Sequence, residues 1–67
     1  MKGYRFITDD DTVDFCQRVT EALSNGWKLY GEPRMTFDHQ RKIMRCGQAV
    51  VKISNKKYKK GIDLGKI

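Results

Sequence analysis

Residues 43–53 read Ile-Met-Arg-Cys-Gly-Gln-Ala-Val-Val-Lys-Ile and form the one extended segment with substantial apolar content at both odd and even positions. Alternate residues of a strand point to opposite sides of a sheet, so this segment is apolar on both sides. A strand of that kind is typical of the middle of a sheet, where both of its faces are covered. We therefore expect Ile43–Ile53 to be the central strand.

Two further strands are predicted outward from this segment. Tyr4–Thr8 is rich in aromatic and β-branched residues, which is typical of a short strand. Residues 27–37 alternate between apolar and polar, which predicts a second strand. Pro33 places that strand at an edge or gives it a bulge, because proline has no N–H to donate to a ladder. The polar residues 38–41 then have the length of a hairpin loop.

A helix is predicted between the first two strands. Its apolar residues recur at spacings of three and four, as in an amphipathic helix. They are Phe15, Cys16, Val19, Ala22 and Leu23. Thr8, Asp9 or Asp10 is the expected N-cap, and Asn25-Gly26 supplies a residue for a left-handed C-terminal cap.

Together these elements predict an α+β fold of the type β-α-β-β, with a three-stranded, mainly antiparallel sheet in the order second, third, first. One helix is expected on one face, beside Gly47 and Ala49, whose small size permits close approach. Residues 1–53 are predicted to form a single compact domain, and residues 54–67 a basic, flexible C-terminal tail.

The composition excludes several classes of protein. The chain has 67 residues, 39% hydrophobic and 33% charged, which is enough for one small domain. Its longest apolar run, Ala49-Val50-Val51, is far shorter than the roughly 20 residues that cross a bilayer or the core of a secretory signal. Two widely separated cysteines fit neither a disulfide framework nor a Cys-x-x-Cys pair. We therefore expect a cytoplasmic protein.

Several motifs occur in a fixed order along the first 53 residues. The most specific are Gly26-Trp27-x-Leu29-x-Gly31-x-Pro33 and residues 47–52, Gly-Gln-Ala-Val-Val-Lys. With Tyr4–Thr8 they resemble a family of short bacterial and phage proteins catalogued as domain of unknown function 1737. The resemblance covers Tyr4 to Ile53 and implies a compact strand-helix-hairpin unit, with no activity or site to transfer. The basic tail departs from the family pattern.

One helix covers only one face of a sheet, so the other face is the first candidate site. By alternation it is expected to present apolar residues among basic and polar ones. The apolar residues are Ile7, Tyr30, Met44, Cys46 and Val50. An exposed patch of this kind is typical of a binding surface for a partner protein, and a homodimer is the simplest arrangement because one patch meets its own copy. The alternative is that the tail folds back and covers this face with Ile62, Leu64 and Ile67.

The tail is the second candidate site. The chain carries a net charge of +6, of which residues 54–67 hold +4 through five Lys and one Asp. Four of these lysines surround one aromatic ring, in the run Lys56, Lys57, Tyr58, Lys59 and Lys60. Cations beside an aromatic ring suit phosphate neutralisation and base stacking, so nucleic-acid binding is the alternative function. A purely solubilising tail remains open.

The remaining candidates favour structural roles, and we expect neither an enzyme nor a cofactor. Asp9, Asp10, Asp11 and Asp14 lack the spacing of a calcium loop and fit helix capping. His39, in the predicted loop, has no identifiable partner for acid or base catalysis.

A single histidine and two distant cysteines cannot form a zinc site within one chain. Cys16 is expected in the core, on the other side of the sheet from Cys46. The aromatic residues could form a stacking platform for bases, but so small a domain needs them in its core. They are Tyr4, Phe6, Phe15, Trp27 and Phe37.

Overall fold

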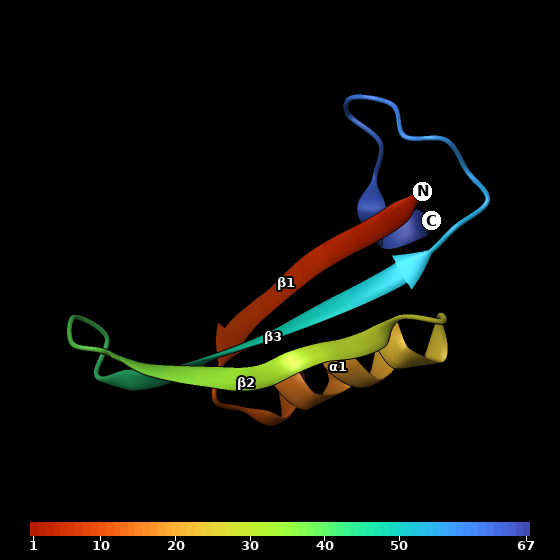
Figure 1. Ribbon diagram of the computed structural model, residues 1–67. Coiled ribbons are helices and arrows are strands. Elements are labelled where there is room, and N and C mark those ends of the chain that lie inside the picture. Colours follow the sequence, from red (N-terminus) through yellow and green to blue (C-terminus); the bar gives the residue numbers. More distant parts are fainter.

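The structure is a computed structural model that describes residues 1–67. It contains three strands, one α-helix and one short 3-10 helix, in an α+β fold of the predicted order (Figure 1). The elements are β1 (Lys2–Asp10), α1 (Val13–Ser24), β2 (Lys28–Asp38), β3 (Ile43–Ile53) and η1 (Leu64–Lys66).

β3 is the central strand, as its apolar content on both faces predicts. The sheet order is β1-β3-β2, and β3 pairs antiparallel with both neighbours. β1 and β2 are therefore parallel to each other, on the two edges. The tight β2–β3 connection begins with Asp38, whose carboxylate accepts hydrogen bonds from the backbone N–H groups of Gln40 and Arg41.

The interruption predicted at Pro33 is present. Between Tyr30 and Arg34 the register of β2 shifts against β3, so that the bulge lies on an edge strand. Gly31, inside the bulge, has a φ of 73°. Below it the buried side chain of Gln48 donates to the carbonyls of Tyr30 and Gly31, each at 3.4 Å, and to that of Ala49 at 2.9 Å.

The helix begins later than predicted. β1 continues through Asp9 and Asp10, and Thr12 is the N-cap, with no hydrogen bond from its side chain. The predicted N-cap at Thr8, Asp9 or Asp10 is wrong, since all three lie in β1. Both carboxylates pair with arginines instead: Asp9 with Arg18, and Asp10 with Arg41 and Arg45. The predicted C-terminal end is confirmed, with Asn25 at the C-cap and Gly26 at a φ of 92°.

The core lies between the helix and one face of the sheet. Ile7, Ala22, Trp27 and Val50 form its buried cluster, and partly buried side chains, among them Phe15 and Val19, pack against it. Complete burial of one branched apolar side chain contributes about 1.5–3 kcal/mol. A domain this small depends on these few residues.

The helix covers the face opposite to the expected one. The β1–β3 register aligns Arg5 with Val50, so Ile7 and Val50 share a face, and they are 2% and 0% exposed. Their branched side chains fill the space beneath α1, which Gly47 and Ala49 would leave empty. The prediction that Ile7, Cys46 and Val50 belong to an uncovered face is therefore wrong.

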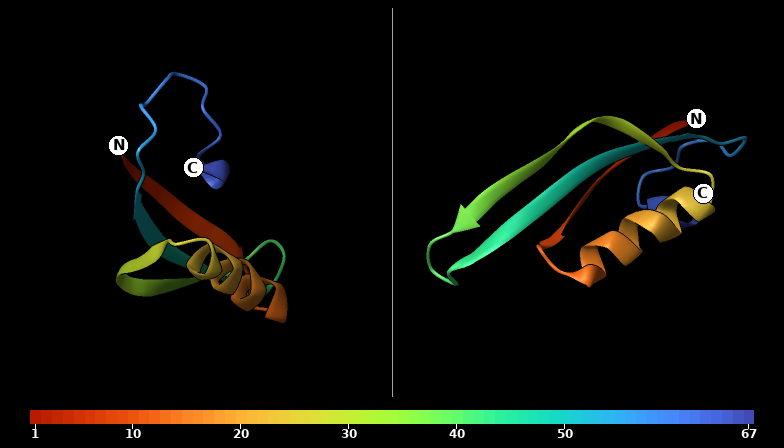
Figure 2. Two further views of the ribbon diagram at one scale, coloured as in Figure 1. Left: turned by 90° about the vertical axis from the view of Figure 1, so that its right-hand side faces the viewer. Right: turned by 90° about the horizontal axis from the view of Figure 1, so that it is seen from below.

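The chain after β3 returns to the helix side of the sheet (Figure 2). Ile67 packs against the core cluster, and Lys52 Nζ donates to its carbonyl at 2.5 Å. A side chain at Gly3 would collide with Ile67, so the glycine permits this close approach. The final residues thus leave the opposite face open.

Candidate functional site

The face of the sheet away from the helix carries the first candidate site, which we call the open face. Register places Phe6, Ala49 and Tyr30 in one row across the three strands. Tyr4, Val51 and Lys28 form the next row. The three aromatic side chains are each 48–58% exposed, because no element of the chain packs over them.

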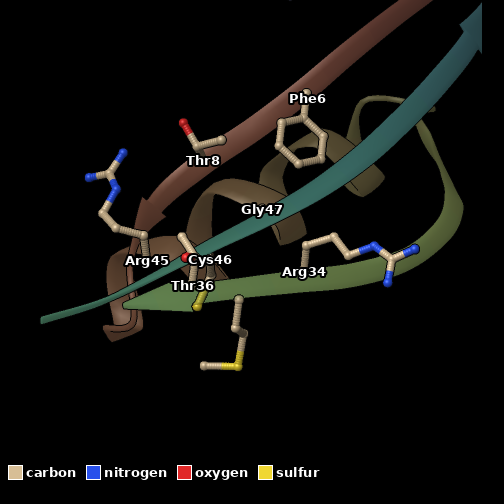
Figure 3. Close-up of a pocket in the computed structure, with 8 residues that line it drawn as sticks. Phe6, Thr8, Arg34, Thr36, Arg45, Cys46 and Gly47 are labelled. Carbon is tan, nitrogen blue, oxygen red and sulfur yellow. The ribbon is translucent and has the colours of Figure 1, made fainter. Parts of the chain in front are cut away.

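Small residues of the central strand form the floor of the open face. Ala49 lies between Phe6 of β1 and Tyr30 of β2, and Gly47 lies between Thr8 and Arg34. The Phe6 ring leans over Gly47, where any larger residue would collide with it. A hollow of about 260 Å³ opens beside this ring, and Thr8, Arg34, Thr36 and Arg45 also line it (Figure 3). A second hollow, of about 360 Å³, adjoins Tyr4, Tyr30 and Val51.

Charge divides the open face into two parts. Near the β2–β3 loop, Arg41 and Arg45 bind the Asp10 carboxylate at 2.6 and 2.9 Å. Hydrogen bonds from Arg41 and then Arg45 lower the pKa of Asp10. The rest of the face carries Lys2, Lys28 and Arg34, and no salt bridge involves them. This part of the face therefore attracts anions.

A second exposed surface lies on the helix side, at the end of the β2–β3 hairpin. α1 has 12 residues and spans about 18 Å, whereas β2 has 11 residues and spans about 36 Å. The hairpin therefore projects beyond the helix (Figures 1 and 2). Met35 and Phe37 are 56% and 43% exposed there, and the half-buried Met44 pairs with Phe37. We call these three residues the hairpin patch.

The residues predicted to form one partner-binding face are thus distributed over three places. Ile7, Cys46 and Val50 are buried, Met44 belongs to the hairpin patch, and Tyr30 lies on the open face. Alternation correctly separates the residues of each strand into two sets. The error lies in combining the Tyr30 set of β2 with the Val50 set of β3, because Tyr30 pairs with Ala49.

The aromatic residues are divided in a similar way. Trp27 is buried, as predicted, and Phe15 packs against the core. The core assignment of Tyr4, Phe6 and Phe37 is wrong, since all three are exposed. A sequence signal for the first two exists: they alternate with Ile7, so they face away from the core whenever Ile7 faces it.

The basic run of the tail lies in an exposed segment beyond the end of the sheet at which β1 begins (Figure 1). The backbone carbonyl of Lys56 accepts a hydrogen bond from the amino group of Met1 at 3.1 Å. Lys57, Tyr58, Lys59 and Lys60 form no hydrogen bond or salt bridge through their side chains. The charges of Lys57, Lys59 and Lys60 are therefore not neutralised by acidic side chains of the chain.

The two cysteines are free thiols on the helix side of the sheet. Cys16 is exposed, so its predicted place in the core is wrong, and the sheet does not separate it from Cys46. Burial, and next the nearby Asp11 carboxylate, raise the pKa of the Cys46 thiol. Cys46 is therefore a weak nucleophile.

The His39 ring packs edge-on against Phe37, with ring centroids 5.1 Å apart. No group of three or more His, Cys, Asp or Glu side chains is placed to hold a metal ion. Neither helix has the length and apolar character that crossing a membrane requires.

The fold and its surfaces define a small α+β domain whose antiparallel sheet is covered on one face only. The family described as Domain of unknown function (DUF1737) matches residues 1–53, and the chain belongs to it. This match includes all three strands and α1, and it ends where β3 ends. No curated protein and no solved structure matches the chain.

Proposed function

We propose that the protein is a small, non-catalytic interaction module that docks on another protein chain, in the simplest case a second copy of itself, through the hairpin patch. The observation that carries this proposal is the exposure of Met35 and Phe37 beyond the end of the helix. Both side chains point to the side of the sheet that elsewhere packs against α1. They are thus core-type residues without a covering element.

The chemistry of the hairpin patch supports a protein partner. Methionine is flexible and polarizable, and it is frequent on surfaces that adapt to a partner. Phenylalanine supplies a large apolar area, and its ring is already supported by His39. The side chains of Met35, Phe37 and Met44 are uncharged, so docking through them removes no charged group from water.

The hairpin geometry supports side-chain packing rather than strand addition. β2 is an edge strand, and the bulge between Tyr30 and Arg34 disrupts a regular ladder. Pro33 lacks the N–H that a neighbouring strand would need. Two projecting hairpins instead pack the same patch against each other across a two-fold axis.

Sedimentation velocity over a concentration series tests this association. The wild-type chain is expected to approach twice its mass of 7.8 kDa. Met35→Asp is expected to remain monomeric because the carboxylate would lose its water on docking. Thr36→Asp is the matched control, since it adds the same charge at the next residue, on the opposite face.

Photo-crosslinking in the cells that produce the protein extends the test to other partners. A benzophenone amino acid at position 35 is expected to give protein adducts, whereas the same group at position 36 gives none. The proposed function is contradicted if the wild-type chain is monomeric at every concentration and the chain with benzophenone at position 35 gives no protein adduct.

A further inference from the structure

We propose that the open face binds a single strand of nucleic acid, with bases stacked on Tyr4, Phe6 and Tyr30 and phosphates held by Lys2, Lys28 and Arg34. This face is separate from the hairpin patch, because alternation along β2 places Tyr30 and Met35 on opposite sides of the sheet. Binding of nucleic acid on the open face is therefore additional to the docking of a protein through the hairpin patch and does not depend on it.

The arrangement of the aromatic rings suits successive bases. Tyr4 and Phe6 are two residues apart on β1, which separates them by roughly 7 Å along the strand. Tyr30 lies two strands from Phe6, at roughly 10 Å, with the small Ala49 between them. Exposed aromatic side chains on a flat sheet surface are a recurrent platform for unpaired bases.

The unpaired cations identify the charge of the ligand. Arg18, Arg41, Arg45 and Lys66 each have an acidic partner. Lys2, Lys28 and Arg34, the cations beside the rings, have no acidic partner. They lie on the two edge strands and therefore flank the floor of the open face. A phosphate backbone supplies negative charge at regular intervals along such a surface.

The same charges disfavour a second copy of the chain on this face. Face-to-face packing of two copies would bring two surfaces of like net charge together, because the Asp10 carboxylate of this face already pairs with Arg41 and Arg45 and leaves Lys2, Lys28 and Arg34 unpaired. The acidic side chains of a peptide would neutralise the cations, but carboxylates are not aromatic and do not stack on the rings of Tyr4, Phe6 and Tyr30 as bases do. A single-stranded nucleic acid satisfies both requirements.

The surface carries little that distinguishes one base from another. The polar side chains lining the hollow beside Phe6 are arginines and the hydroxyl groups of Thr8 and Thr36. Stacking accepts every base, because each has a flat aromatic face. We therefore assign binding that is largely independent of sequence.

Fluorescence anisotropy with labelled oligothymidylate and oligouridylate, each about 12 nucleotides long, tests the proposal and distinguishes DNA from RNA. Tyr30→Leu removes the ring but keeps an apolar side chain, and Tyr58→Leu is its matched control in the tail. Lys28→Gln removes a charge from the open face, and Lys42→Gln removes one from the hairpin loop. Circular dichroism is the check that each variant is folded.

Both Tyr30→Leu and Lys28→Gln are expected to weaken binding, whereas their controls leave it within about twofold. Loss of one stacked base corresponds to a reduction of about 5-fold or more. Three neutralised phosphates on a single strand predict that wild-type affinity falls roughly 20-fold between about 50 and 200 mM salt. Lys28→Gln is expected to reduce this salt dependence.

Two results would overturn the proposal. The first is no binding of either oligonucleotide at about 50 mM salt, where the electrostatic contribution is large. The second is binding that Tyr58→Leu weakens and Tyr30→Leu does not, which would move the site to the tail. Neither result bears on dimerisation, which the Met35→Asp measurement reports separately.

Discussion

Substitution of two neighbouring valines tests which face of the sheet the helix covers. Val50 is fully buried under α1, whereas Val51 is half-buried on the open face. Val50→Asp removes a burial that contributes about 1.5–3 kcal/mol. An aspartate in the core must also be protonated at pH 7, about three pH units above its ordinary pKa, which costs about 4 kcal/mol.

The sum, about 5–7 kcal/mol, is comparable with the whole stability of a chain of this size. At about 0.05–0.15 kcal/mol per residue, 67 residues give about 3–10 kcal/mol. Val50→Asp is therefore expected to be mostly unfolded at 25 °C by far-UV circular dichroism. Val51→Asp is expected to stay folded and to lose only about 1 kcal/mol in urea unfolding. A Val50→Asp chain with the wild-type urea midpoint would refute the assignment of the faces.

Three other substitutions or conditions give distinct outcomes. Gln48→Leu leaves the bulge carbonyls without their side-chain donor and is expected to lower the free energy of unfolding by about 1–3 kcal/mol in urea; an unchanged midpoint would show that this amide is not needed. Ellman's reagent at pH 8 is expected to modify Cys16 rapidly and Cys46 only after denaturation, because burial raises the pKa of Cys46; two equally fast thiols would contradict its burial. Arg41 and Arg45 lower the pKa of Asp10. The stabilisation that the ionised Asp10 carboxylate gives to the fold is therefore complete above the ordinary carboxyl pKa and is lost as the pH falls through the lowered value. The free energy of unfolding of the wild type is expected to fall below about pH 4. Asp10→Asn is expected to reduce that fall in urea midpoints measured against pH, and an identical fall would exclude a role for Asp10.

Local patterns in the sequence predict most of the secondary structure. The two-sided apolar character of Ile43–Ile53 gives both the central strand and the sheet order. Pro33 indicates the edge strand and its bulge, and Gly26 the end of the helix. Each of these features depends on residues close together in the chain, so a sequence pattern contains it.

The choice of covered face is not contained in such a pattern. Alternation divides each strand into two sets, but which set of β2 shares a face with which set of β3 depends on the register of the hairpin, in which Asp38 pairs with Ile43 and Tyr30 with Ala49. Volume then decides the packing, because Ile7 and Val50 fill the space under the helix and Gly47 cannot. The residues of each candidate site depend on which face the helix covers, so predicting the wrong face also gives the wrong site residues.

The position of the C-terminus is equally non-local. Ile67 packs against the core beside Gly3, at the other end of the chain. Residues 54–67 have no hydrophobic period that would predict this contact. The length of α1 relative to the hairpin is a further example, since the exposure of Met35 follows from a comparison of two elements.

The most direct test of the open face as a binding surface is an NMR titration of the methyl-labelled, full-length chain with oligothymidylate. The resonances of Ala49 and Val51, on the floor of that face, are expected to shift in proportion to the oligonucleotide bound. Those of Val50 and Ala22, on the buried side of the same sheet, are expected to stay in place. Binding that leaves Ala49 and Val51 unshifted, or an oligonucleotide that does not bind, would contradict the account.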